Sequence, residues 1–241
     1  MVGIGPGDPS YLSRRALEVL RRAEVIVGYT PYLKLLAEVL APGQVVEGSG
    51  MREEVARARL AVELALSGRR VAVVSSGDAG IYGMAGLVLE VLLETGEHHR
   101  VEFEVVPGIT AASAAAALLG APLMHDFAVI SLSDLLTPWD VILSRIEAAA
   151  WGDFVIVFYN PKSRHRVKQI AAAREVILRY RDPATPVGIV TGAGRAGQRV
   201  VLSDLAGFLK EEINMHSLVL VGNSRSYIKD GRLVTPRGYR I

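Results

Sequence analysis

The feature that most constrains this chain is the alternation of short, continuous apolar runs with longer amphipathic segments. Most of the runs are apolar at successive positions, as expected for strands covered on both faces. The predicted strands are Val2–Ile4, Glu24–Val27, Val71–Ser75, Phe103–Val106, Ala128–Ser131, Val155–Phe158, Val187–Val190 and Leu218–Val221. The alternation of strands and helices along the chain implies parallel sheets with helical crossovers, so the predicted fold class is α/β.

Helical periodicity is clearest between residues 52 and 66. Val55, Val62 and Leu66 recur at spacings that place them on one helix face, and Gly68 is positioned to end the helix. A second helical pattern covers residues 10–22. These segments are the predicted crossovers between strands.

Composition changes between residues 107 and 125, where the strand–helix alternation pauses. Pro107-Gly108 is followed by an alanine-rich stretch at 111–119 and by Gly120-Ala121-Pro122, after which a strand pattern resumes. At about 150 residues per domain, the length of 241 residues allows either one large α/β domain or two small ones, and the change in composition favours two. We therefore expect an N-terminal domain over residues 1–112 and a C-terminal domain over residues 113–241.

Charge and cysteine content exclude several classes of protein. With 27 basic and 25 acidic residues the net charge is +2, too small for the electrostatic footprint of a nucleic-acid-binding protein. The absence of cysteine excludes disulfides, thiolate zinc sites and a cysteine nucleophile, and it favours a reducing compartment. The five histidines lack metal-ligand spacing, so no metal site is expected.

Targeting signals are also missing from the pattern. The opening residues lack the basic and apolar regions of a signal peptide. The longest uncharged run, residues 109–124, is interrupted by glycine and proline and is shorter than the roughly 20 residues of a membrane-spanning helix. We expect a cytoplasmic protein with no membrane partner.

The first strand runs into a glycine-rich loop, Gly3-Ile4-Gly5-Pro6-Gly7, followed by Asp8 and Pro9. Asp8 is a good N-cap and Pro9 suits a first helical turn, so helix initiation explains part of the motif. The spacing differs from the Gly-x-Gly-x-x-Gly of dinucleotide-binding proteins. The acidic residue that would bind a ribose is absent at the end of the second predicted strand, residues 25–29, which argues against a nicotinamide cofactor.

Two more turns follow predicted strands, at residues 75–83 (Ser-Ser-Gly-Asp-Ala-Gly-Ile-Tyr-Gly) and at residues 107–111 (Pro-Gly-Ile-Thr-Ala). In open parallel sheets, ligands bind beyond the carboxyl ends of the strands, which is where all three turns lie. Three such turns in one half of the chain predict a single pocket. The alternative for each turn alone is that its glycines provide turn geometry and that Asp78 caps the next helix.

The combination of these strings identifies a family resemblance that runs nearly from end to end. The carrying residues are Val-Gly-Ile-Gly-Pro-Gly-Asp at 2–8, Ser-Ser-Gly-Asp-Ala-Gly-Ile-Tyr-Gly at 75–83, Val-Pro-Gly-Ile-Thr-Ala at 106–111, and Phe-Tyr-Asn-Pro at 158–161. They resemble the tetrapyrrole (corrin/porphyrin) methyltransferases that use S-adenosylmethionine. The resemblance implies two α/β domains, a parallel sheet in the first and a mixed sheet in the second, with the cofactor in the cleft between them. It also implies a homodimer.

Longer strings resemble those family members that methylate C17 of a precorrin ring with ring contraction in cobalamin biosynthesis. They are Gly-Tyr-Thr-Pro-Tyr at 28–32, Gly-Met-Arg-Glu-Glu at 50–54, residues 124–139 (Met-His-Asp-Phe to Leu-Thr-Pro-Trp), and Val-Gly-Asn-Ser at 221–224. The expected substrate is therefore a small-molecule tetrapyrrole, either precorrin-3B or its cobalt form.

Motif matching carries the family's cofactor-binding positions onto this sequence. The residues expected to contact S-adenosylmethionine, or S-adenosylhomocysteine as product, are Pro6, Gly77, Asp78, Ile81, Thr110, Ala111, Asn160 and Ala193. His125 and Asp126 are the first candidates for the proton movements of ring contraction, with a structural role at the domain junction as the alternative. The candidate ligands for ring carboxylates are Arg52, Lys162, Arg164, Arg195 and Arg199, each of which also suits solvated surface charge.

The sequence is also compatible with two other functions. One is a non-catalytic nucleotide-binding or regulatory module on the same scaffold, because a fold alone does not fix a function. The other is a family member that acts at a different ring carbon or on another substrate, such as a modified protein histidine or ribosomal RNA.

Overall fold

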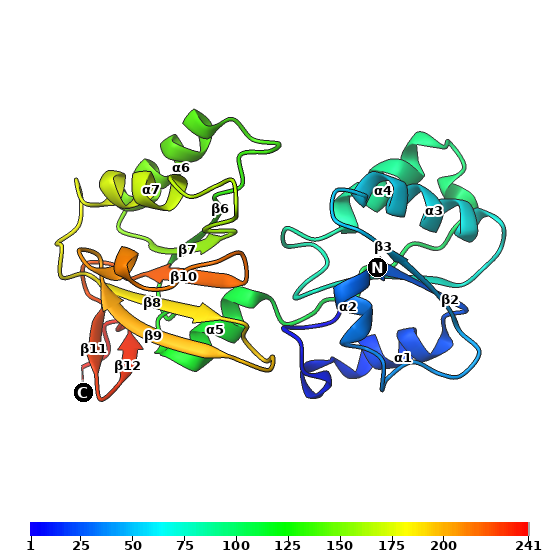
Figure 1. Cartoon of the computed structure of the whole chain (residues 1–241), viewed down its shortest axis with the longest axis horizontal. Helices are drawn as coiled ribbons and strands as arrows, with labels where there is room; N and C mark the ends of the chain where they lie inside the picture. Colours follow the sequence, from blue (N-terminus) through cyan, green and yellow to red (C-terminus); the bar gives the residue numbers. More distant parts are fainter. Residues whose placement is uncertain (241) are drawn as a thin grey trace. The chain divides into compact units, whose positions relative to one another are not determined.

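Residues 1–240 are described by the computed structural model, and they divide into two compact units, Met1–Ala111 and a second that begins at Ala112 (Figure 1). The helices and strands of the first unit are β1 (Val2–Gly3), a 3₁₀ helix (Pro9–Tyr11), α1 (Arg14–Arg22), β2 (Val25–Tyr29), α2 (Thr30–Lys34), β3 (Val45–Ser49), α3 (Glu54–Leu66), β4 (Val71–Ser75), α4 (Ala85–Glu94) and a 3₁₀ helix (His98–Arg100).

The first unit is built on a parallel sheet in the order β1-β4-β2-β3. Successive side chains of its central strands point to opposite faces of the sheet and pack in two separate hydrophobic cores. Val25, Val27 and Val73 pack with α3 and α4, whereas Ile26 and Val74 pack on the opposite face with α1 and α2. Helices cover both faces of the sheet in Figure 1. This two-sided burial explains the continuous apolar runs and confirms the predicted parallel α/β architecture.

The second unit contains a mixed sheet and a smaller three-stranded sheet. Its elements are α5 (Ala111–Leu119), β5 (Gly120–Ala121), β6 (Phe127–Ser131), α6 (Trp139–Trp151), β7 (Val155–Tyr159), α7 (Gln169–Ile177), β8 (Pro186–Thr191), β9 (Arg199–Asp204), a 3₁₀ helix (Phe208–Lys210), β10 (Ser217–Val221), β11 (Tyr227–Lys229) and β12 (Arg232–Val234). The main sheet has the order β6-β7-β10-β8-β9, with β6 and β7 parallel and the remaining pairs antiparallel.

Both faces of this mixed sheet are also covered. Helices α6 and α7 pack on one face, in a core that includes Ile146, Phe158 and Ile177. Leu119 of α5 lies against Gly188 of β8. A Cβ atom added to Gly188 would lie only 2.5 Å from Leu119 Cδ1. In the small sheet, β12 pairs antiparallel with β11 and parallel with β5.

One predicted strand is wrong and two predicted helices are shorter than expected. Residues 103–106 form no strand, since the segment is joined to β1 only through Val106, whose N–H bonds to the Met1 carbonyl at 2.8 Å. The pattern at residues 10–22 divides at Ser13, whose hydroxyl accepts a hydrogen bond from the Ala16 N–H at 3.0 Å and starts α1. Helix α3 begins at Glu54, and Val55 remains exposed in its first turn.

No helix within residues 1–240 is both long enough and apolar enough to cross a lipid bilayer.

Candidate functional site

The first and second glycine turns are bonded to each other at the carboxyl ends of β1 and β4. The Gly5 N–H donates to the Gly77 carbonyl at 3.0 Å, and the Gly77 N–H donates to the Gly5 carbonyl at 2.7 Å. Both residues have positive φ, +71° and +69°, which other residues adopt only with strain. The adjacent, parallel positions of β1 and β4 bring these two turns together.

The third turn packs against the other two through Gly108. A Cβ atom on Gly108 would lie 2.1 Å from the Gly77 carbonyl oxygen, and one on Gly3 would lie 2.7 Å from the Gly108 nitrogen. The obstructing atoms are all backbone, so no side-chain adjustment could make room. These glycines are therefore required for the three turns to meet at one edge of the sheet.

Asp78 links the second turn to the third. Its Oδ2 atom accepts a hydrogen bond from the Gly108 N–H at 2.9 Å, and its Oδ1 atom accepts one from the Gly80 N–H at 2.8 Å. Helix α4 begins later, and its Met84 N–H donates instead to the Ser75 hydroxyl at 3.2 Å. The alternative in which Asp78 caps the next helix is therefore wrong.

The three turns suit a neutral or cationic ligand better than a polyphosphate. Residues 3–8, 75–83 and 106–111 contain two aspartates and no lysine or arginine. Of the predicted cofactor contacts in this unit, Pro6 and Gly77 are buried, whereas Asp78, Thr110 and Ala111 are half-buried. Ile81 is exposed and offers an apolar surface beside them.

The predicted contacts of the second unit lie at one edge of its main sheet. Because β8 runs in the same direction as β6 and β7, the carboxyl ends of these three strands share that edge. Asn160 follows β7 with φ +50°, and its Nδ2 atom donates to the hydroxyl of Ser131, the last residue of β6, at 3.0 Å. Ala193 follows β8 between two glycines of positive φ, Gly192 and Gly194.

His125 and Asp126 occupy the opposite edge of this sheet. They immediately precede β6, whereas Asn160 and Ala193 follow β7 and β8. The Asp126 N–H donates to His125 Nδ1 at 2.9 Å, and the two side chains approach to 3.7 Å. Their side chains are 42% and 80% exposed, so both are accessible to a ligand or to solvent.

The basic side chains proposed for ring carboxylates have different surroundings. Arg166, beside Lys162 and Arg164, is buried and donates through Nε to the Asn160 carbonyl at 3.1 Å, so it supports that turn. Burial lowers the pKa of the Arg166 guanidinium, against the opposing effect of Asp134. Arg199 pairs with Glu211 and Glu212. The N–H groups at the start of a helix can bind an anion. Helix α7 begins only at Gln169, so these groups do not directly follow the basic cluster at 162–166.

One residue near the carboxyl edge of the first sheet was missed by sequence reasoning. Arg57 is only 4% exposed, and its Nε atom donates to the Ser49 hydroxyl at 2.6 Å. The available signal was its position in α3, where Arg57 adjoins Ala58 and precedes Ala61 by one turn on the buried face.

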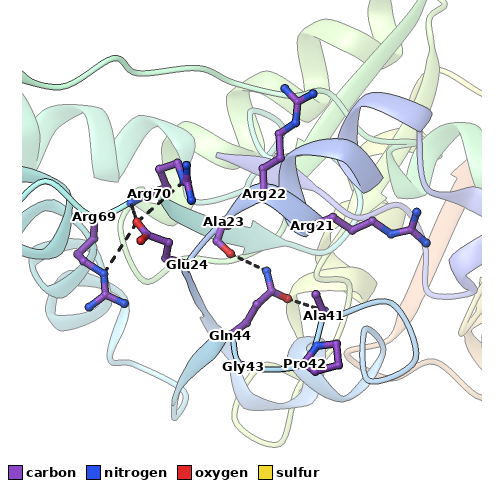
Figure 2. Close-up of a pocket in the computed structure, with 10 residues that line it drawn as sticks. All are labelled: Arg21, Arg22, Ala23, Glu24, Ala41, Pro42, Gly43, Gln44, Arg69 and Arg70. Carbon is purple, nitrogen blue, oxygen red and sulfur yellow. Dashed lines mark hydrogen bonds and ion pairs between the residues drawn. The ribbon is translucent and has the colours of Figure 1, made fainter.

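A separate open depression of about 630 Å³ lies at the amino-terminal edge of the first sheet (Figure 2). It is lined by Arg21, Arg22, Ala23, Glu24, Ala41, Pro42, Gly43, Gln44, Arg69 and Arg70. The Glu24 carboxylate accepts a hydrogen bond from the Arg70 N–H at 2.8 Å and faces the guanidinium groups of Arg69 and Arg70. Since residues 24, 44 and 70 precede β2, β3 and β4, this depression is at the other end of the strands from the glycine turns.

No group of three or more histidine, aspartate or glutamate side chains in residues 1–240 is arranged to hold a metal ion.

Comparison with known sequences identifies relatives along the whole chain. Residues 1–208 match the model of the Tetrapyrrole (Corrin/Porphyrin) Methylases. A cobalt-factor III methyltransferase of Priestia megaterium is 50% identical over 242 residues, and this chain spans 45% of that relative's length. A probable cobalt-factor III C(17)-methyltransferase of Salmonella typhimurium is 49% identical over 241 residues, covering 100% of this chain and 99% of the relative.

Solved structures share the fold at similar coverage. The crystal structure of the methyltransferase CobJ superposes with a TM-score of 0.90 at 36% identity, covering 98% of both chains. A uroporphyrin-III C-methyltransferase from Thermus thermophilus, complexed with S-adenosylhomocysteine, has a TM-score of 0.66 at 26% identity. That match covers 92% of this chain and 95% of the Thermus chain.

Proposed function

The chain belongs to the tetrapyrrole (corrin/porphyrin) methylases, and from this membership we propose that it transfers a methyl group from S-adenosylmethionine to C17 of cobalt-factor III or of metal-free precorrin-3B. The observation that carries the proposal is the 49% identity to the Salmonella relative over the full length of both chains. The proposed activity places the protein in cobalamin biosynthesis, with ring contraction accompanying the methyl transfer.

The glycine turns suit S-adenosylmethionine in charge. The donor carries a sulfonium and an ammonium group, and the turns present aspartate without any basic side chain. The glycines at positions 3, 77 and 108 allow the three turns that carry the proposed contacts to pack closely on one another. The residues proposed to hold it are Pro6, Gly77, Asp78, Ile81, Thr110 and Ala111 from the first unit, with Asn160 and Ala193 from the second.

When bound, S-adenosylmethionine supplies an electrophilic methyl group on its sulfonium and leaves as S-adenosylhomocysteine. The protein's part is mainly orientation and exclusion of water, because an in-line displacement needs neither a metal nor a covalent nucleophile. Both carboxylate oxygens of Asp78 are engaged by backbone N–H groups. Asp78 therefore holds the second and third turns in place while it contributes negative charge beside the cationic donor.

His125 and Asp126 remain the proposed proton-transfer residues for ring contraction. Their exposure and their direct contact support the proposal, since an imidazole beside a carboxylate can exchange a proton with a ligand. Wild-type rates of contraction by both Asp126→Asn and His125→Ala, measured with saturating substrate, would exclude this role.

Assembly and location are part of the same proposal. We expect domains 1–112 and 113–241 from the change in composition between residues 107 and 125, a cytoplasmic location from the absence of cysteine, and a homodimer by analogy with the family. Sedimentation equilibrium of the purified protein tests the dimer directly.

The decisive experiment is incubation with methyl-¹³C-labelled S-adenosylmethionine and either cobalt-factor III or precorrin-3B. A product heavier by one labelled methyl group, with the ¹³C signal assigned to C17, is the expected result, and the relative rates identify the metal state of the substrate. Labelling at another ring carbon would assign a different reaction within the family. Calorimetry showing preference for NAD or ATP over S-adenosylhomocysteine would reject methyl transfer.

A further inference from the structure

Arg57 is a buried cation whose guanidinium contacts only neutral groups. Besides the Ser49 hydroxyl, it donates to the Gly50 carbonyl at 2.8 Å and to the Met84 sulfur at 3.7 Å, and it lies 5.9 Å from the centre of the Tyr29 ring. No carboxylate in the described residues forms an ion pair with it. A buried charge without a counter-ion is costly, so its retention suggests a role beyond packing.

The contacts of Arg57 fix the loop that follows β3. Its fork holds Ser49 and Gly50, while Met84 begins α4 directly after the second glycine turn. The loop, residues 49–53, thus lies at the carboxyl edge of the parallel sheet, the edge that also carries the three glycine turns. Arg57 joins this loop to the start of α4.

The same loop exposes a second arginine in a strained backbone conformation. Arg52 has φ +67°, a region that costs a non-glycine residue about 1–2 kcal/mol, and its side chain is exposed. The neighbouring acids are engaged by the loop itself: Glu53 accepts from the Gly50 N–H at 2.5 Å and Glu54 accepts from the Arg52 N–H at 3.3 Å. No ion pair engages the Arg52 guanidinium within residues 1–240.

We propose that loop 49–53 binds one side-chain carboxylate of the tetrapyrrole substrate, with Arg52 as the contacting residue and Arg57 as the positioning residue. The inference rests on the proposed function, which supplies a substrate with many carboxylates. A guanidinium can bind a carboxylate through two parallel hydrogen bonds. Strain is stored where the surrounding contacts fix a backbone, and here Glu53, Glu54 and Arg57 provide those contacts.

The first test is the KM for cobalt-factor III in Arg52→Gly and Arg52→Lys enzymes. Glycine removes the charge and also relieves the positive φ, so this variant is expected to fold at least as well as the wild type. Its KM should rise by about tenfold or more, as for loss of a charge-assisted bond, while kcat and the Kd for S-adenosylhomocysteine stay within about twofold. Lysine keeps the charge but cannot form the two parallel hydrogen bonds, so it should restore only part of the affinity.

The matched control is Arg22→Ala, which removes one positive charge at the opposite edge of the same sheet. It should leave KM unchanged. An equal rise in KM for Arg22→Ala and Arg52→Gly would mean that only net charge matters, and it would overturn the proposal. A wild-type KM in Arg52→Gly would overturn it as well.

The second test asks whether Arg57 acts through the loop. Arg57→Gln should raise KM in the wild-type background but add little in the Arg52→Gly background, because both changes disable the same contact. Additive effects of the two substitutions would exclude the positioning role. Retained binding of S-adenosylhomocysteine verifies that the variant is folded, and Arg57→Lys replaces it if folding fails.

The proposed function and the proposed role of loop 49–53 can be refuted separately. If wild-type protein transfers no methyl group to either tetrapyrrole, the proposed function is wrong. If the wild type transfers the group and the Arg52 variants match its KM, only the role of loop 49–53 is wrong.

Discussion

The carboxylate of Asp78 accepts a hydrogen bond from the backbone N–H of Gly108 at 2.9 Å, although the two residues are thirty positions apart. The bond joins the turn after β4 to the segment that leads into α5. The Asp78 side chain therefore links the loop after β4 to the loop before α5. The conformation of one loop consequently depends on the other.

Replacing Asp78 with alanine should weaken both stability and cofactor binding. The N–H groups of Gly80 and Gly108 lose their acceptors, and a partly buried unsatisfied N–H costs about 1–3 kcal/mol. Urea denaturation should show a loss of about 2 kcal/mol. Calorimetry should show a Kd for S-adenosylhomocysteine raised by about tenfold or more, the change that corresponds to losing at least 1.4 kcal/mol of binding energy.

The control for this variant is Asp182→Ala. Asp182 accepts a similar local bond from the Ala184 N–H at 2.7 Å in the second unit, and it precedes β8, whereas Ala193 follows that strand. It should not alter cofactor affinity. Unchanged affinity in Asp78→Ala would remove this residue from the proposed site.

Gly108→Ala should be strongly destabilising. The new methyl group would meet backbone atoms of Gly77 and Gly3, so the turns must separate, at a cost of about 3 kcal/mol. Gly86→Ala, in α4 with open space around it, should instead stabilise by about 0.5 kcal/mol. Thermal and urea unfolding of both variants check the contrast, and a mild effect of Gly108→Ala would show that the turns can shift.

Arg181→Met should destabilise the second unit while cofactor affinity in the folded protein is preserved. The buried guanidinium donates to the carbonyls of Phe154 and Gly222 at 2.8 and 2.7 Å and lies 3.3 Å from an Asp153 oxygen. Burial lowers the Arg181 pKa, partly offset by Asp153. Removing the guanidinium takes this donor away from the two carbonyls, for which we expect a loss of about 3 kcal/mol in urea unfolding.

The comparison variant for Arg181 is Arg179→Ala. Its surface pair with Glu147, at 3.7 Å and largely exposed, should contribute about 0.5 kcal/mol or less. Losses of similar size in the two variants would contradict the structural role assigned to Arg181.

Glu104 should make stability depend on pH in the acid range. The hydrogen bonds from Arg15 lower the pKa of its carboxyl below the ordinary value of 4.5. Since the folded state holds the proton less tightly, this stabilisation is present above pH 4.5 and is lost as pH falls through the lowered pKa. Wild type should therefore exceed Glu104→Gln in stability at pH 6, and the difference should shrink towards pH 3.

Urea titrations at both pH values measure this difference, with Glu90→Gln of α4 as an exposed control. A gap between wild type and Glu104→Gln that stays constant from pH 6 to pH 3 would contradict the linkage to this carboxyl.

Most of the strands that the sequence predicted well are buried on both faces, and the edge strand β6 is the exception. In β2, β4, β7 and β10, continuous valine and isoleucine runs reflect two-sided packing. The edge strands β3 and β9 have no buried residue and carry polar residues, so their apolar runs are short. The β11–β12 hairpin was missed although Asp230-Gly231, both with positive φ, is a strong turn signal.

The meeting of the first two glycine turns could be predicted, because both follow parallel strands whose carboxyl ends lie at the same edge. The third turn joins them although residues 103–106 form no strand. The bond from Gly108 to Asp78 could not be foreseen, since spacing does not distinguish a helix cap from a bond between loops. Arg57 was missed for a related reason. Its neutral partners Ser49, Gly50 and Met84 carry no charge pattern that sequence could match to a buried guanidinium.

The pairing of β5 with β12 has a consequence for biosynthesis. Every strand of the first unit finds its partners within residues 1–111, so that unit can be complete while the ribosome is still translating the rest. Gly120 can pair with Leu233 only after β12 has been translated. Until then β5 of the nascent second unit has no strand to pair with. This is the interval in which chaperones would be most needed.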